Sequence, residues 1–115
     1  MRTPSILVIT RQKLKPARLP YSAKNLFGFG AYEIATSKKK AKVVIFASGS
    51  EVEIAMTAKE MLEKKGVAAR VVSVPSLELF ERQSKAYKAK VLATEKIRID
   101  IEAGVRTCWD QFIGV

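Results

Sequence analysis

The sequence predicts an α/β fold built on a largely parallel sheet. Val43–Ser48 is an apolar run with the length of a strand, and a helical pattern begins directly after it at Ser50. A second apolar run, Val67–Val74, follows that helix and ends at Pro75. Strand, helix and strand within roughly thirty residues form a βαβ unit, so the two strands should run parallel with a right-handed crossover.

Length and composition limit the classes to which the chain can belong. Its 115 residues fill one domain of the usual ~100–200 residues. We expect no membrane segment, because no apolar run approaches ~20 residues, and no secretory signal, whose apolar stretch is roughly 7–15 residues. One cysteine and no histidine exclude a disulfide framework, a Cys/His zinc site and a histidine acid–base catalyst. They fit a reducing compartment, so we expect a cytoplasmic protein.

The N-terminal part does not have the pattern of a compact domain. Ser5–Thr10 is a β-branched run that suits a strand buried on both faces. Residues 11–30 contain two prolines and two glycines, and no helical or alternating pattern holds there. Stretches of that length without structure are uncommon inside a compact domain and natural between two. We therefore interpret residues 11–30 as a linker or as a loop that follows the protein surface.

The middle of the chain contains a short strand and one well-marked helix. Ala31–Ala35 is predicted to be the strand, and the basic turn Thr36–Lys42 separates it from the parallel pair. Ser50 and Glu53 have the spacing of a capping box, and Gly66 should end the helix. The apolar positions of the helix predict one buried stripe: Ile54, Ala55, Ala58, Met61 and Leu62.

Shorter elements are predicted after the second parallel strand. Ser76 can cap a short helix that holds Phe80, and Ser84–Leu92 forms another helix. The residues of this second helix expected to face the core are Tyr87, Val91 and Leu92. Ile97–Ile101 alternates strictly between apolar and charged residues, which predicts an edge strand with one solvent-exposed face. Cys108–Ile113 has the pattern of the start of a further helix.

The net charge of +10 is unevenly distributed. Residues 1–42 carry ten lysines and arginines against one acid, whereas residues 43–115 carry eleven against ten. The N-terminal basic residues could bind nucleic acid through its phosphates, but no recognised nucleic-acid-binding module accompanies them. We interpret them as a solvated linker or as a surface that faces other protein. A small basic nucleic-acid-binding protein is the alternative.

Three features could bind a ligand or catalyse a reaction, but each has a simpler structural explanation. The Gly49–Ser50 turn could hold an anion at a helix N-terminus, but it lacks the spaced glycines of a phosphate loop. Asp100 and Glu102 share one strand face, where two carboxylates most simply make the face of an edge strand hydrophilic. Cys108 has no histidine to activate it as a nucleophile. We therefore predict no catalytic residue in this chain.

Arg11 is a different kind of candidate. It lies just past the carboxyl end of the predicted strand Ser5–Thr10, where α/β sheets place their ligand contacts. A guanidinium there can hold a phosphate through two parallel hydrogen bonds. A linker arginine more often serves only solubility, so chemistry alone leaves both interpretations open.

The order of several short segments resembles transketolase, from the end of its middle domain into its C-terminal domain. The segments that carry the resemblance are Ile9–Gln12, Gly30–Tyr32, Phe46–Val52, Arg70–Ser76, Phe80–Gln83, and Ile101–Gly104 with Trp109. Related thiamine enzymes share the βαβ core, but the Val-Pro-Ser step at Val74–Ser76, followed by Phe80 and Gln83, favours transketolase. The resemblance covers nearly the whole chain.

The resemblance implies a three-layer α/β/α fold with a mixed, mostly parallel sheet, in which Ala31–Ala35 runs antiparallel to the other strands. Residues 1–25 then correspond to the last strand of the preceding, pyrimidine-binding domain and a linker. Residues 26–115 correspond to the C-terminal domain. The family continues past this point with another strand and helix, so the resemblance also implies that the C-terminal domain is truncated.

The same resemblance implies a fragment of an enzyme that transfers a two-carbon ketol unit between sugar phosphates in the pentose phosphate pathway. The family uses thiamine diphosphate and a divalent metal, Mg²⁺ or Ca²⁺, whose ligands lie in other domains. The fragment should therefore bind neither and be inactive by itself. Of the family's functional positions only the substrate-phosphate arginine maps here, onto Arg11, although Thr10 replaces the usual serine. The implied partners are the remaining domains of the parent chain, a second subunit in a homodimer and the sugar phosphate.

Overall fold

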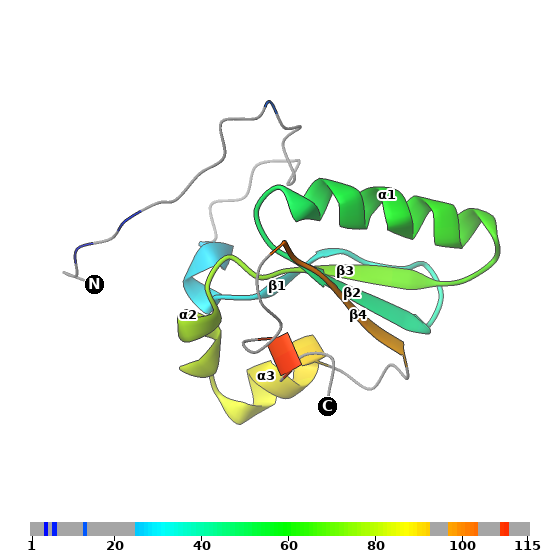
Figure 1. Cartoon of the computed structure of the whole chain (residues 1–115). Coiled ribbons are helices and arrows are strands. Elements are labelled where there is room, and N and C mark those ends of the chain that lie inside the picture. Colours follow the sequence, from blue (N-terminus) through cyan, green and yellow to red (C-terminus); the bar gives the residue numbers. More distant parts are fainter. Residues whose placement is uncertain are drawn as a thin grey trace.

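The computed structural model describes residues 25–92, 97–103, 109 and 110, together with the single positions 4, 6 and 13. Within them the chain forms, in order, the 3-10 helix η1 (Leu26–Phe29), β1 (Tyr32–Ala35), β2 (Val43–Ala47), α1 (Glu51–Lys64), β3 (Ala69–Ser73), α2 (Leu77–Glu81), α3 (Lys85–Leu92) and β4 (Ile97–Ile101) (Figure 1). The strand predicted at 5–10 lies outside the described residues except for Ile6. The helix predicted at 108–113 lies outside them except for Trp109 and Asp110.

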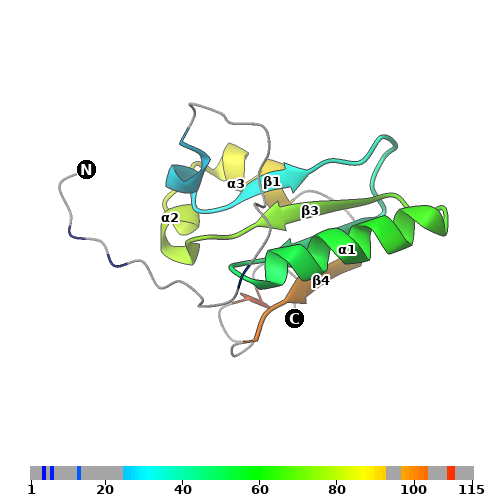
Figure 2. The same ribbon diagram turned by 90° about the horizontal axis from the view of Figure 1, so that it is seen from above.

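The four strands form one mixed sheet in the order β1-β3-β2-β4. β2 runs parallel to β3 and to β4, and Val43 lies opposite both Ala69 and Ile97. β1 pairs antiparallel with β3. α1 covers one face of the sheet, whereas α2 and α3 lie on the other (Figures 1 and 2). The predicted α/β/α fold, its parallel βαβ unit and the antiparallel direction of the strand at 31–35 are therefore confirmed.

The central strands are buried on both faces, which explains why they appear in the sequence as continuous apolar runs. Successive residues of a strand point to opposite faces, so Val43, Ile45 and Ala47 of β2 pack on the α1 side. Val44 and Phe46 of the same strand point into the cluster on the other side. The remaining buried members of that second cluster are Ala31, Val72, Val74, Phe80, Val91 and Trp109.

α1 begins without the predicted capping box. Ser50 has helical backbone angles (φ −66°, ψ −22°), and its hydroxyl donates to Glu51 Oε1 at 3.2 Å instead of capping the helix. A capping serine needs an extended backbone to reach the first N–H groups of the helix. Glu51 and Glu53 in the first turn complement the positive end of the helix dipole instead. The predicted stop is confirmed, because Gly66 follows the helix with φ +81°.

The apolar stripe predicted along α1 is only partly buried. Ala55 is buried and Leu62 packs against the sheet, but Ile54 and Met61 are 56% and 60% exposed. Ile54 and Met61 are seven residues apart, so they lie together on one flank of the helix, beyond the arc that touches the sheet. The sequence period identifies which residues share a side of the helix. The width of the contact with the sheet decides which of them are buried.

β4 lies at an edge of the described sheet, as predicted, but its most exposed residues are not the polar ones. Ile97 and Ile99 are 52% and 40% exposed, whereas Arg98 and Asp100 are half-buried. The two isoleucines point to the α1 side, since they lie opposite residues of β2 that pack under α1. α1 contacts mainly β2 and β3, so the described residues leave this outer part of the face uncovered.

The two short helices on the other face form as predicted. Ser76 has an extended backbone, and its hydroxyl accepts a hydrogen bond from the Leu79 N–H at 3.3 Å, which caps α2. The inward residues predicted for α3 are confirmed: Tyr87, Val91 and Leu92. Both helices therefore bury their apolar residues against the same side of the sheet.

Gly30 brings the chain directly against the start of α2. Its backbone has φ +79°, and its carbonyl accepts a hydrogen bond from the Ser76 N–H at 3.0 Å. A Cβ added there would lie 2.1 Å from the Phe80 nitrogen and 2.5 Å from the Ser76 carbonyl oxygen. The position therefore needs glycine both for its backbone angle and for its lack of a side chain.

Replacing Gly30 with alanine should destabilise the domain far more than the same change at Gly66. The two glycines have φ of +79° and +81°, but nothing lies within 4 Å of a Cβ at Gly66. Gly66→Ala should lower the free energy of unfolding by about 1–2 kcal/mol, the backbone cost alone. Gly30→Ala adds a clash with α2 and should exceed that loss by about 2 kcal/mol or more. Urea unfolding followed by circular dichroism measures both changes, and equal losses would contradict the close approach.

Candidate functional site

Arg11 and Cys108 lie outside the described residues. Of the ten basic residues in 1–42, five lie outside the described residues, and the described ones are Lys13, Lys38, Lys39, Lys40 and Lys42. The remaining candidates lie at the two ends of the parallel strands and in a cavity beside β1.

A side-chain hydrogen bond joins the carboxyl ends of β2 and β4. Ser48 Oγ, which follows β2, donates to Glu102 Oε2, which follows β4, at 2.7 Å. Asp100 lies within β4, opposite Phe46. Glu102 therefore holds two strand ends together, a structural role that the sequence did not indicate.

The turn between β2 and α1 is a poor site for an anion. The N–H groups of Glu51 and Val52 already donate to the carbonyls of Ser48 and Gly49, at 3.1 and 3.3 Å. Glu51 and Glu53 also place two carboxylates in the first turn of the helix. A bound phosphate would meet engaged donors and like charge, so the turn serves as a helix start.

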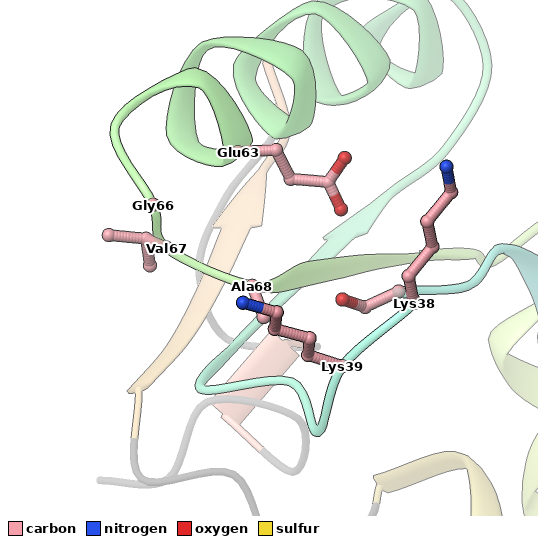
Figure 3. Close-up of a pocket in the computed structure, with 7 residues that line it drawn as sticks. Lys38, Lys39, Glu63, Gly66, Val67 and Ala68 are labelled. Carbon is pink, nitrogen blue, oxygen red and sulfur yellow. The ribbon is translucent and has the colours of Figure 1, made fainter.

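A cavity of about 220 Å³ lies at the opposite, amino ends of the parallel strands (Figure 3). Its lining residues are Ser37, Lys38, Lys39, Glu63, Gly66, Val67 and Ala68. Lys38 and Lys39 extend from the β1–β2 connection, and Glu63 of α1 lies across from them (Figure 3). Lys38 and Lys39 are exposed, as predicted for this basic turn.

This cavity can attract an anion through its lysines, but it lacks the groups for covalent chemistry. The Glu63 carboxylate already accepts a hydrogen bond from Lys59 Nζ at 2.7 Å. The N–H groups of Gly66 and Val67 donate to carbonyls of the last turn of α1, at 3.0 and 2.9 Å. The exposed lysines complement the negative end of the α1 dipole, which is a sufficient reason for their position.

A second cavity, of about 200 Å³, lies beside β1 and contains a buried arginine that the sequence analysis did not single out as a functional residue. Arg70 of β3 is only 6% exposed. Its Nη1 donates to Glu33 Oε2 at 3.2 Å, and its Nη2 donates to the Val91 carbonyl at 2.8 Å. Val91 lies in the last turn of α3, so the guanidinium also compensates a helix C-terminus. Arg70 therefore ties β1, β3 and α3 together.

Tyr87 forms the aromatic wall of this second cavity. Its hydroxyl donates to the Ala31 carbonyl at 2.7 Å, and its ring stacks on Phe29 with centroids 4.9 Å apart. Burial raises the pKa of the Tyr87 phenol above its ordinary value of 10.0. The polar groups of Arg70 and Tyr87 form hydrogen bonds with other parts of the protein. These two residues therefore stabilise the fold around the cavity.

A signal for Arg70 was present in the sequence: it is the one charged residue in the otherwise apolar run Val67–Val74. Buried charges are rare unless they are engaged by partners. Its partners come from residues 33 and 91, far away along the chain, and only the fold brings them together.

The described residues contain no group of three His, Cys, Asp or Glu side chains that could hold a metal ion. Among the described helices, none is both long and apolar enough to cross a membrane.

Residues 30–115 match the family model of the transketolase-like TK C-terminal domain. The chain belongs to the transketolase family. It is 42% identical over 112 residues to a transketolase from Rhodobacter capsulatus, covering 97% of this chain and 17% of the relative. The chain thus spans about a sixth of the length of this relative.

Solved transketolase structures have the same fold. The enzyme from Campylobacter jejuni superposes with a TM-score of 0.71 at 38% identity, covering 84% of this chain and 15% of that one. A transketolase from Pichia stipitis in complex with sedoheptulose-7-phosphate gives a TM-score of 0.66 at 36% identity, covering 70% of this chain and 12% of that one. This chain therefore corresponds to the C-terminal domain of an enzyme family of transferases.

Removing the Arg70 guanidinium should cost more stability than removing the charge of its acidic partner. Arg70→Met leaves the buried Val91 carbonyl without this donor, so we expect a loss of about 1–3 kcal/mol in the free energy of unfolding. Glu33 is half exposed, and water can replace its bond, so Glu33→Gln should cost less than about 1 kcal/mol. Urea unfolding at neutral pH measures both losses. Equal losses would show that Arg70 stabilises the protein mainly through its ion pair with Glu33 and not through its bond to the Val91 carbonyl.

Tyr87→Phe should lower stability and also alter its dependence on alkaline pH. Losing the hydrogen bond to Ala31 should cost about 0.5–1.5 kcal/mol. Because the folded protein holds the Tyr87 proton more tightly than the unfolded chain, this contribution is complete below the unfolded pKa of about 10. It is lost as pH rises through the raised pKa of the folded state. The wild-type minus Tyr87→Phe difference in unfolding free energy should therefore shrink above pH 10, whereas a constant difference would contradict this explanation.

Proposed function

We propose that this chain is a segment of a thiamine diphosphate-dependent transketolase, which transfers a two-carbon ketol unit between sugar phosphates in the pentose phosphate pathway. The match of residues 30–115 to the family's C-terminal domain carries the proposal. The related Pichia stipitis enzyme in complex with a sugar phosphate supports this class of substrate. The family match favours this function over a nucleic-acid-binding protein. We propose that the parent enzyme is a cytoplasmic homodimer.

The described residues do not fit thiamine diphosphate or its metal. They offer no cluster of metal ligands, and the N–H groups of the turn before α1 are engaged. Other domains of the parent enzyme would therefore bind the cofactor and the Mg²⁺ or Ca²⁺ ion. On this proposal residues 26–115 form a structural, non-catalytic domain, and residues 1–25 form the last strand of the preceding domain with its linker.

Arg11 is the one residue that we propose for substrate binding. It follows the predicted strand Ser5–Thr10, and it corresponds by resemblance to the family's substrate-phosphate arginine. Its planar guanidinium would bind the terminal phosphate of the sugar through two hydrogen bonds. It would not touch the reacting carbons, so its role is binding and not bond-breaking.

A chimera tests the proposed function. The matching region of the Rhodobacter capsulatus transketolase is replaced by residues 1–115 of this chain, which share 42% identity with it. The chimera should catalyse ketol transfer between sugar phosphates, whereas the 115-residue chain alone should show neither activity nor heat of binding with thiamine diphosphate and Mg²⁺. A folded but inactive chimera, or micromolar cofactor binding by the chain alone, would count against the proposal.

Arg11→Ala in this chimera should raise KM for phosphorylated sugars about 10- to 100-fold and leave kcat unchanged. A charge-assisted bidentate contact contributes roughly 1.5–3 kcal/mol, and binding lost equally from ground and transition states appears in KM. Arg11→Lys should recover only part of the loss, because an ammonium cannot form the planar fork. Hydroxypyruvate, a donor without phosphate, is the control. An equal defect with hydroxypyruvate would make Arg11 a structural residue.

A further inference from the structure

Two connections bring exposed lysines together at the amino ends of β2 and β3. One connection joins β1 to β2, and the other joins α1 to β3 (Figure 1). They lie side by side, because the Lys42 N–H donates to the Ala68 carbonyl at 2.9 Å and because residues of both line the cavity in Figure 3. The basic end of the domain consists of the exposed lysines of these connections: Lys38, Lys39, Lys40, Lys42, Lys64 and Lys65.

The rest of the described structure does not neutralise the basic end. None of its lysine side chains forms an ion pair within the part of the chain that the structure describes. The segments 36–42 and 63–68 contain one acid, Glu63, which is already paired with Lys59 at 2.7 Å. Six lysines against one acid leave a surplus of five positive charges at one end of the domain.

The helix dipole explains why lysines lie here, but not how many there are. The C-terminus of a helix carries about half a negative charge. Lys64 ends α1 and Lys65 follows it directly, so these two are enough to compensate that charge. The four lysines of the β1–β2 connection add mutual repulsion, which opposes a compact state. Binding of a negatively charged partner would relieve this repulsion.

We propose that the basic end binds the phosphate backbone of duplex nucleic acid, independently of base sequence. A duplex carries one negative charge per about 1.7 Å, and its neutralisation by lysines releases condensed counterions. An extended acidic peptide carries at most one charge per about 3.3 Å, so it offers half that charge density. The segments 36–42 and 63–68 contain no aromatic residue on which an unpaired base could stack, which favours a duplex over a single strand.

This kind of binding does not need a recognised nucleic-acid-binding module. Such modules place side chains against base edges, whereas phosphate contacts carry no sequence information. Lysine is a point charge on a flexible stem, so it can follow a phosphate backbone without a fixed geometry. The basic end provides the phosphate contacts alone.

The salt dependence of binding tests the proposal on the 115-residue chain. Fluorescence anisotropy with a labelled DNA duplex should give a Kd of about 1–100 µM at physiological salt. Lys38→Gln/Lys39→Gln and Lys64→Gln/Lys65→Gln should each weaken binding about tenfold and reduce the slope of log K against log salt by about 1.8, because each lysine contributes about 0.9. Since the two connections form one surface, the variant with all four changes should reduce the slope by about 3.6.

Two controls separate the basic end from net charge and from an acidic protein partner. Lys85→Gln/Lys90→Gln removes the same charge from two exposed lysines of α3, on the other face of the sheet from α1, and should leave the slope nearly unchanged (Figure 1). Polyglutamate at equal charge should compete at least tenfold less well than unlabelled duplex. Acetylation by acetic anhydride, followed by mass spectrometry, should show protection by the duplex at the basic end but not at Lys85 and Lys90.

The same four substitutions in the Rhodobacter capsulatus chimera show whether other domains of the enzyme cover the basic end. We expect the same reduction in slope there. A Kd above about 1 mM at physiological salt, an equal change in the α3 control, or a chimera whose slope the substitutions do not alter would each overturn the proposal. Equal competition by polyglutamate would also overturn it, by identifying an acidic protein segment as the partner.

Discussion

β2 and β3 are covered by helices on both faces, and this double burial determines what the rest of the domain must supply. Every residue of these strands is buried, so α1 must cover one face while α2 and α3 cover the other. Arg70 is the charged exception in β3, and a buried guanidinium requires partners. Its bonds to Glu33 and to the Val91 carbonyl attach the edge strand β1 and the end of α3 to the central sheet. The packing of α3 on the sheet therefore depends partly on the hydrogen bond of the buried Arg70 guanidinium.

Charged residues lie at both ends of the parallel strands in the described part of the chain. Lysines gather at the amino ends, beside the negative end of α1, and Glu102 accepts a bond from Ser48 at the carboxyl ends. Neither place combines a nucleophile, an acid–base pair or a set of metal ligands among the described residues. The described groups at the two ends therefore hold strand ends and a helix end in place.

The uncovered surface of the domain has a simple geometric origin. One helix of fourteen residues contacts mainly β2 and β3, so Ile97 and Ile99 of β4 on the same face are left half exposed. The flank of α1 with Ile54 and Met61 is exposed for the same reason. Apolar residues in these positions are costly to leave in water.

The sequence alone determined the elements from β1 onward and their order, because they depend on local patterns. It did not predict the 3-10 helix η1 (Leu26–Phe29), since residues 11–30 show no helical pattern. Apolar runs, helical periods, the Ser76 cap and the Gly66 stop were sufficient to predict the βαβ unit and the short helices. The resemblance to transketolase supplied the antiparallel direction of β1 and the one proposed substrate contact, Arg11. The sequence did not show that Ser50 would lack its capping bond, since that depends on the backbone angles of a single turn.

Only the tertiary structure decided which faces are covered and which distant groups meet. Period-2 alternation placed the isoleucines of β4 on one face, but the position of α1 left that face exposed. The partners of Arg70 and the contact of Tyr87 with Ala31 join residues 21 to 56 positions apart. The need for glycine at position 30 also appears only when α2 lies against it. Such contacts cannot be predicted from local sequence patterns, because they form only when segments that are distant in the sequence pack against each other.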